Sequence, residues 1–108
     1  MKDFDKIIWR DALTFVDFFA VWCGPCRAMQ PVIDKFQKEM NGRADVYRAD
    51  IEDPDLIEIV RRYNIMSVPT LMFFRRGEVL WRESGLASYD HLVNVLRELE
   101  KREQVAQR

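Results

Sequence analysis

The sequence predicts an α/β fold in which helices cover both faces of a central mixed sheet of about four strands. Predicted helices and strands follow one another in the order α-β-α-β-α-β-β-α along the 108 residues. The first strand, helix and strand in succession predict two parallel strands joined by a right-handed crossover. The strands are strongly apolar, so helices have to cover both faces of the sheet.

The elements of the first half are predicted from the spacing of apolar residues. Residues 4–11, FDKIIWRD, have the spacing of a short helix. Residues 13–20, LTFVDFFA, are dense in β-branched and aromatic residues and predict a buried strand. Apolar residues then recur at spacings of three, four and seven from about Gly24 to Met40, which predicts a helix ended by the following Asn-Gly pair. Residues 44–51, ADVYRADI, predict a second strand.

Caps and turns delimit the elements of the second half. The Asp-Pro pair at residues 53–54 predicts the start of a helix. Pro69 opens a third strand, TLMFF, which the sequence RRGE turns back into a fourth, EVLWRES. Because arginine at both early turn positions disfavours a type I′ turn, we expect a type I turn with Gly77 left-handed in a bulge. Ser88 is expected to cap the last helix.

Length, composition and charge limit the possible functions. A chain of 108 residues is most simply one domain, residues 1–108, and its 48% of hydrophobic residues is enough for a packed core. The 17 basic and 18 acidic residues nearly cancel, which gives no reason to expect a nucleic-acid partner. No segment is apolar enough for a secretory signal or a membrane span. The sequence therefore predicts a cytoplasmic protein without a membrane partner.

The chain offers too few ligands for a metal site. Its two cysteines, Cys23 and Cys26, supply two zinc ligands, whereas a structural zinc site takes four. The only histidine, His91, lies far along the chain, and no cluster of carboxylates completes a set. We therefore expect no metal ligands, and a solvated His91 in the first turn of the last helix.

The cysteine pair has the arrangement of a redox site. Both cysteines belong to the segment Trp-Cys-Gly-Pro-Cys between a predicted strand and a predicted helix. This order places Cys23 at the helix N-terminus, where unpaired N–H groups and the helix dipole stabilise a thiolate, the nucleophile of disulfide exchange. Cys26 lies one turn further on and should be more buried, and it can attack a mixed disulfide. Gly24 permits the tight turn, and Pro25 occupies a first-turn position that needs no N–H. Two core cysteines are the alternative interpretation.

An acid lies inside the predicted strand that precedes the cysteines. Strand alternation puts Asp17 on one face with Phe15 and Phe19, and both faces have the composition of buried ones. Burial disfavours an ionised carboxylate, so the pKa of Asp17 should be raised. Asp17 could then exchange a proton with Cys26 through water. The alternative is a structural ion pair between Asp17 and a buried cation such as Arg48.

Three stretches resemble the thioredoxin family over nearly the whole chain. They are VDFFAVWCGPCRAMQPVIDKF, SVPTLMFFRRGEV and SGLAS, which are similar to its active site, its cis-proline loop with hairpin, and its second substrate loop. The resemblance implies that Cys23 attacks, that Cys26 resolves, and that Asp17 is the buried acid of the family. It also implies a cis peptide bond before Pro69. The implied partner surface consists of Trp22, Gly24, Pro25, Val68, Pro69, Gly85 and Leu86.

Four departures from the family pattern are visible. The first strand usual in the family is missing, so the sheet should have four strands with residues 44–51 at an edge. Phe19 stands where a second tryptophan is common. Arg48 occupies the position of a lysine often found near the buried acid, and arginine stays charged where lysine can adapt. Ser67 and Leu86 replace smaller residues of the two loops.

The resemblance implies a protein dithiol–disulfide oxidoreductase that reduces disulfides in partner proteins. It would act as a monomer without a bound cofactor, because the Cys23–Cys26 pair carries the electrons, and a thioredoxin reductase would restore the dithiol. One alternative is a dedicated thiol oxidant or isomerase outside the cytoplasm, which the Gly-Pro dipeptide and the missing signal disfavour. The other is a thioredoxin-like binding module that uses the surface at Pro69 without turnover.

Overall fold

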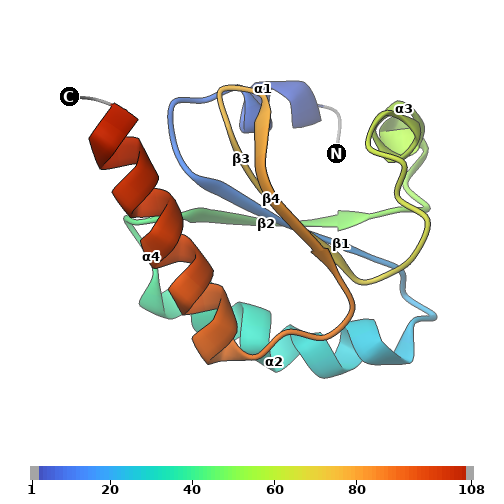
Figure 1. The fold of residues 1–108 in the computed structure, drawn as a ribbon. Coiled ribbons are helices and arrows are strands. Elements are labelled where there is room, and N and C mark those ends of the chain that lie inside the picture. Colours follow the sequence, from blue (N-terminus) through green and yellow to red (C-terminus); the bar gives the residue numbers. More distant parts are fainter. Residues whose placement is uncertain (1–2, 107–108) are drawn as a thin grey trace.

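The computed structural model describes the backbone of residues 3–106 and the side chains of residues 3–103. A mixed sheet of four strands lies at its centre, in the order β2-β1-β3-β4 (Figure 1). The strands are β1 (Thr14–Phe19), β2 (Asp45–Asp50), β3 (Thr70–Arg75) and β4 (Glu78–Ser84). β1 runs parallel to β2 and antiparallel to β3, and β4 is antiparallel to β3. The prediction of a four-stranded sheet with the second strand at its edge is confirmed.

Helices cover both faces of this sheet, as predicted. They are α1 (Phe4–Ile8), α2 (Gly24–Glu39), the 3₁₀ helix η1 (Pro54–Leu56), α3 (Ile57–Arg62) and α4 (Tyr89–Ala106). α2 and α4 lie on one face, and α1 and α3 lie on the other (Figure 1). The helix expected after residues 53–54 therefore begins as a 3₁₀ turn and continues as α3.

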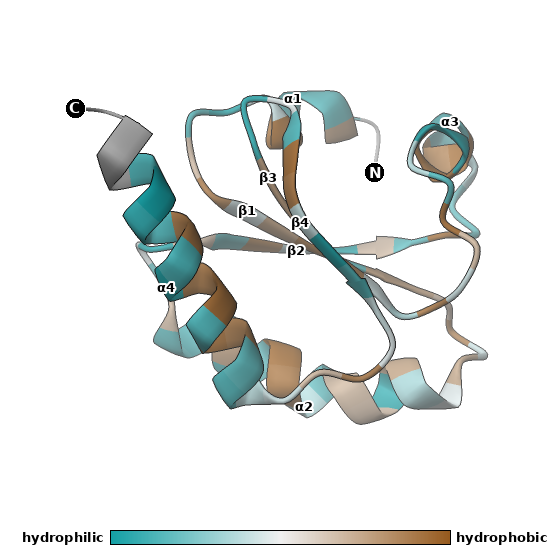
Figure 2. Cartoon of the chain, in the orientation of Figure 1, coloured by the Kyte–Doolittle hydropathy of each residue, from teal (hydrophilic) through white to brown (hydrophobic). Residues whose placement is uncertain are grey.

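Two cores, one on each face, account for the apolar character of the central strands. On the α2 and α4 face, the ring of Phe15 lies 5.3 Å from that of Phe36 and 5.0 Å from that of Phe73. On the opposite face, the ring of Phe4 lies 5.8 Å from that of Phe18. Successive β1 residues alternate between the two cores, so both faces of the strand are buried. The apolar sides of the helices face inward (Figure 2).

The predicted caps are present. Ser88 Oγ accepts a hydrogen bond from the backbone N of His91 at 3.1 Å, and Asp53 Oδ1 accepts one from the backbone N of Asp55 at 2.9 Å. Both contacts satisfy backbone N–H groups that a helix start leaves unpaired. α2 ends before Gly42, whose φ is 87°, as the Asn-Gly pair indicated.

In the turn between β3 and β4, Gly77 is left-handed as predicted, but the turn type and the position of the bulge differ from the prediction. Its two central residues, Arg76 and Gly77, have φ values of 51° and 77°, so the loop has the backbone signs of a type I′ turn rather than a type I turn. The irregularity in the ladder lies between Phe73 and Phe74 instead of at Gly77. Backbone N–H groups of the turn donate to the segment after α1, from Arg76 to Arg10 at 3.1 Å and from Gly77 to the carbonyl of Ile8 at 2.9 Å. These hydrogen bonds offset the local preference of arginine against positive φ.

Candidate active site

The two cysteines lie at the start of α2. Cys23 is the N-cap residue, and its Sγ accepts a hydrogen bond from the backbone N of Cys26 at 3.1 Å. Gly24 and Pro25 form the first helical positions, where proline loses no hydrogen bond. A disulfide joins Cys23 and Cys26, whose Cα atoms lie 5.2 Å apart. The structure therefore holds the oxidised form of a dithiol placed at a helix N-terminus.

Burial distinguishes the two cysteines only slightly. Cys23 is 4% exposed and Cys26 is 1% exposed, so the expected order is present but both are buried. They form a small cluster with Ala20, against which Ile51 and Val68 pack. In the reduced state, the N–H groups of the helix start would face a Cys23 thiolate directly, which favours the charged form.

Two loops from the second half of the chain meet beside Cys23. The Val68–Pro69 peptide bond is cis, as the family resemblance implied. The backbone oxygen of Val68 lies 3.6 Å from Cys23 Sγ. The backbone N of Gly85 donates to the backbone oxygen of Pro69 at 2.8 Å. The start of β3 and the end of β4 therefore bring together three residues of the expected partner surface, namely Val68, Pro69 and Gly85.

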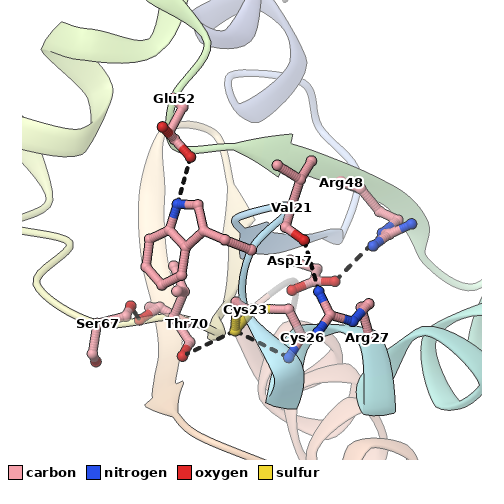
Figure 3. Close-up of a disulfide and its surroundings, with 11 residues drawn as sticks. Asp17, Val21, Cys23, Cys26, Arg27, Arg48, Glu52, Ser67 and Thr70 are labelled. Atoms are coloured by element: carbon pink, nitrogen blue, oxygen red, sulfur yellow. Dashed lines mark hydrogen bonds and ion pairs between the residues drawn. A yellow bond between two sulfur atoms is a disulfide. The ribbon is translucent and has the colours of Figure 1, made fainter.

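Thr70 holds these two loops, and the sequence analysis missed it. Its Oγ1 donates to the backbone oxygen of Ser67 at 2.7 Å (Figure 3). The same atom lies 3.0 Å from Ser84 Oγ. The side chain is fully buried. A hydroxyl directly after Pro69, at the start of an otherwise apolar strand, was the available signal. A buried hydroxyl needs such partners, so Thr70 links the loop before β3 to the last residue of β4.

Large apolar side chains are exposed on the three loops that carry Cys23, Val68 and Gly85. Each follows or precedes Cys23, Val68 or Gly85 by one or two residues. The exposed fractions are 67% for Val21, 64% for Trp22, 82% for Met66 and 64% for Leu86. Apolar surface gathered at loops that meet is typical of a protein-binding site. Of the expected partner surface, Trp22 and Leu86 are the most exposed members with large side chains.

Asp17 is buried in β1 without a hydrogen bond. Its side chain is 0% exposed, and neither carboxylate oxygen has a hydrogen-bond partner among the described residues. Burial raises the pKa of Asp17 to about 6, and the positive charge of Arg48 opposes that shift. Arg48 is the register partner of Asp17 on β2, with Nε 3.5 Å from Oδ2. The sequence allowed two interpretations of Asp17, a desolvated acid and an ion-pair partner of Arg48. The structure has features of both, because the carboxylate is buried and also lies beside the cation.

A groove lies beside Arg48 and the disulfide. It has a volume of about 240 Å³, and Cys26, Arg27 and Arg48 are among its lining residues. The Arg48 guanidinium lies over the ring of Phe19, with Cζ 4.5 Å from the ring centroid. Two of the four departures from the family pattern, Phe19 and Arg48, therefore contact each other at this groove. Cys26 therefore lines the same groove as Arg48, whereas Asp17 is not among the lining residues.

Two further charged groups border the site and were not singled out from the sequence. Trp22 Nε1 donates to Glu52 Oε1 at 2.5 Å, and a nitrogen of the Arg27 guanidinium donates to the backbone oxygen of Val21 at 2.9 Å (Figure 3). Their positions give the surface around the disulfide an acidic group at the indole and a basic group at the start of α2. Trp22 precedes α2 and Glu52 follows β2, and no local pattern in the sequence indicates that these two residues form a pair.

Comparison with known proteins decides the family. The family model described as Thioredoxin matches residues 1–98. The chain belongs to the thioredoxin family. Thioredoxin from Staphylococcus epidermidis is 34% identical over 95 residues, which cover 88% of each chain. Thioredoxin-1 from Saccharomyces cerevisiae is 38% identical over 84 residues, or 78% of this chain and 79% of the relative.

A solved structure agrees with this assignment. The crystal structure of thioredoxin from Trypanosoma brucei brucei superposes with a TM-score of 0.82 at 30% identity, covering 94% of this chain and 86% of that one. Membership of the thioredoxin family, together with two cysteines joined in a disulfide at a helix N-terminus, makes the chain a dithiol–disulfide oxidoreductase. Its redox-active group is the Cys23–Cys26 disulfide.

Three further expectations from the sequence concern metal ligands, membrane-spanning helices and His91. Among these residues, no three His, Cys, Asp or Glu side chains are grouped to hold a metal ion. None of the helices between residues 3 and 106 combines the length and the apolar character that crossing a membrane requires. His91, expected to be solvated, is exposed but has its Nε2 2.9 Å from Glu83 Oε2 and its ring 6.1 Å from that of Trp81.

Proposed function

We propose that this oxidoreductase reduces disulfides in partner proteins, with Cys23 as the nucleophile. In the first step, the Cys23 thiolate attacks one sulfur of a partner disulfide. A mixed disulfide forms between the two proteins, and the second partner sulfur leaves as a thiolate that takes up a proton. The position of Cys23 as the N-cap of α2 supports this assignment, because the helix start favours its thiolate.

In the second step, Cys26 resolves the mixed disulfide. Its thiol loses a proton, and the resulting thiolate attacks Cys23 Sγ, which releases the partner as a dithiol and leaves the Cys23–Cys26 disulfide. Two electrons pass from the cysteine pair to the partner. Asp17 receives the Cys26 proton through water. The raised pKa of Asp17, caused by burial, and the groove shared by Cys26 and Arg48 support this role.

The partner would bind where the loops meet beside Cys23. An extended partner segment would pair with the backbone at Val68, as an added strand does. The proposed contact residues are those of the sequence-based prediction, namely Trp22, Gly24, Pro25, Val68, Pro69, Gly85 and Leu86. The exposed Trp22 and Leu86 and the short distance from Val68 to Cys23 support this surface.

The remaining features follow those of the family. We assign the chain one thioredoxin domain, residues 1–108, which works as a cytoplasmic monomer without a bound cofactor, a membrane or nucleic acid. A thioredoxin reductase supplies the electrons that restore the dithiol. The near balance of charges in the sequence and the family match over residues 1–98 support these assignments.

The observation that carries the proposal is the Cys23–Cys26 disulfide at the start of α2. The direct test is reduction of insulin by catalytic amounts of the protein, with dithiothreitol and then with NADPH and a thioredoxin reductase. We expect turnover with both electron sources. An equilibrium with glutathione would place the potential near that of thioredoxins, about −270 mV, rather than near disulfide isomerase, about −180 mV. A biological effect retained by the Cys23→Ser, Cys26→Ser double variant would identify a binding module instead.

A further inference from the structure

The indole of Trp22 and the carboxylate of Glu52 form a pair at the edge of the redox site. Trp22 directly precedes Cys23 and is 64% exposed, so most of its ring remains open to a partner. Its Nε1 donates to Glu52 Oε1 at 2.5 Å, which places a negative charge at one edge of the ring (Figure 3). The exposed ring and the carboxylate are thus adjacent to each other, and the ring belongs to the residue directly before the attacking cysteine.

The segment that carries Glu52 is held against the cysteines. Ile51 packs on the cluster formed by Ala20, Cys23 and Cys26, and its backbone N donates to the carbonyl of Phe19 at 2.9 Å. The backbone N of Glu52 donates to Asp50 Oδ1 at 2.9 Å. The Glu52 carboxylate therefore has a position set by backbone contacts as well as by the indole. Within residues 3–103, no lysine, arginine or histidine forms an ion pair with it.

We propose that Trp22 and Glu52 form a subsite for a lysine or arginine side chain next to the reacting cysteine of a partner protein. A partner that places its sulfur on Cys23 has to lay a neighbouring residue over or beside Trp22. The aliphatic stem of a lysine or arginine packs on the indole face, and its cation meets the ring and the carboxylate together. The inference rests on the proposed reduction of partner disulfides. It adds that partners with a lysine or arginine beside the reacting cysteine are reduced fastest.

The opposite side of the disulfide has the opposite charge. Arg27 is in α2, one residue after Cys26, and its guanidinium donates to the backbone oxygen of Val21. An acidic partner residue is therefore favoured there, and a basic one at Trp22. This asymmetry favours one orientation of a charged partner segment at the disulfide. Complementary charge mainly raises the rate of association, so the preferred orientation should react faster.

The test uses short peptides with one internal disulfide that differ only at the residue beside one cysteine, which is lysine, serine or glutamate. Two such sets place this residue before or after the cysteine. Stopped-flow measurement gives the rate at which the reduced protein attacks each peptide. A lysine also lowers the pKa of a neighbouring thiol and makes it a better leaving group. The informative quantity is therefore the lysine-to-glutamate rate ratio of the wild type divided by that of a variant.

Glu52→Gln removes the charge but retains an oxygen that can accept from Trp22 Nε1. Glu58→Gln in α3 removes the same charge from an exposed position without the indole and serves as the matched control. In one peptide set, we expect Glu52→Gln to lower the lysine-to-glutamate ratio by about threefold to fivefold, with the serine peptide unchanged. The difference should shrink at high salt, and Glu58→Gln should keep the wild-type ratio.

Equal ratios for the wild type and Glu52→Gln in both peptide sets would overturn the inference, and Glu52 would then only orient Trp22. The same fall in the ratio with Glu58→Gln would also overturn it, since net charge alone would explain the preference. If the wild type reduced none of the peptides, the proposed function would fail, and this inference would fail with it. Reduction of all peptides without a preference would leave the proposed function intact.

Discussion

The two ends of strand β1 differ in how their charged groups are arranged. β3 pairs antiparallel with β1, so Arg75 lies beyond Thr14, at the end opposite the disulfide. There, Arg75 forms ion pairs with Asp11 and Glu103. At the disulfide end, Asp17 is buried without a hydrogen bond beside one cation.

The direction of the pKa shifts follows this difference. Hydrogen bonds from Arg76 and Arg75 lower the pKa of Asp11, so its contribution to stability is present at neutral pH and disappears as pH falls through the folded-state value. Burial raises the pKa of Asp17 to about 6, so its charge opposes folding at neutral pH. One end therefore stabilises the fold, while the other retains an unfavourable group beside the reactive cysteines. Substitutions at the disulfide end should therefore change activity, whereas substitutions at the opposite end should change stability alone.

The largest expected effect comes from the cysteines. Cys23→Ser should lower insulin reduction to the level of the uncatalysed reaction, because no thiol remains at the helix start. Cys26→Ser should instead accumulate covalent mixed disulfides, which mass spectrometry detects. Alkylation of the reduced wild type by iodoacetamide near pH 7 should modify Cys23 first. Faster alkylation of Cys26 would reverse the two roles.

Asp17→Asn should change stability and rate in opposite directions. Below the ordinary pKa of 3.8, both the folded and the unfolded chain hold the proton and the penalty vanishes. The penalty grows as pH rises and levels off above about 6. The shift corresponds to about 3 kcal/mol, so Asp17→Asn should raise the free energy of unfolding at pH 7 by about 1–3 kcal/mol. Release of the mixed disulfide should slow by about tenfold or more.

Urea melts at pH 7 and pH 4 and a single-turnover assay measure the two effects of Asp17→Asn. The stability gain should be smaller at pH 4 than at pH 7. Arg48→Met is the companion variant, since it removes the neighbouring cation while Asp17 stays. It should shift the pH dependence of mixed-disulfide release to higher pH. An Asp17→Asn variant that is less stable and equally fast would show that Asp17 is a structural ion-pair partner.

The hairpin turn offers a test of stability without a change of chemistry. Gly77 has a φ of 77°, and a Cβ placed there would collide with the Trp9 ring. Gly42 has a φ of 87° with nothing within 4 Å of such a Cβ. Gly77→Ala should therefore cost about 2 kcal/mol or more in thermal or urea unfolding, and Gly42→Ala about 1 kcal/mol. Equal losses of unfolding free energy for the two variants would show that the collision of the new Cβ with Trp9 contributes nothing.

The smallest effect is expected from the ion pairs at the same end. Arg75→Met keeps the aliphatic stem but leaves Asp11 and Glu103 without this cation. The free energy of unfolding should fall by about 1 kcal/mol, while insulin reduction stays at the wild-type rate. Arg61→Met changes an exposed arginine of α3 and should have no measurable effect on either quantity. A loss of activity in Arg75→Met would contradict the separation of the two ends.

The hairpin turn shows where sequence-based prediction failed. The local preference of arginine against positive φ predicted a type I turn, and Arg76 nevertheless has a φ of 51°. The turn donates backbone hydrogen bonds to the carbonyl oxygens of Arg10 and Ile8, which lie more than sixty positions earlier in the chain. A prediction from neighbouring residues cannot include contacts of this kind. The same limit hid Glu52, because its partner Trp22 lies thirty positions away in the sequence.

By itself, the sequence determined the elements, the sheet and the chemistry of the cysteine pair. Apolar spacing, caps and the Trp-Cys-Gly-Pro-Cys segment act over a few residues, so they can be read along the chain. Only the tertiary structure decided that the backbone oxygen of Val68 lies 3.6 Å from Cys23 Sγ, and that Thr70 links the loop before β3 to the end of β4. It also decided that the Asp17 carboxylate is desolvated and lies beside Arg48 without a hydrogen bond. Those contacts arise when strands distant in the sequence pair in one sheet, because that pairing sets the distances between side chains on different strands.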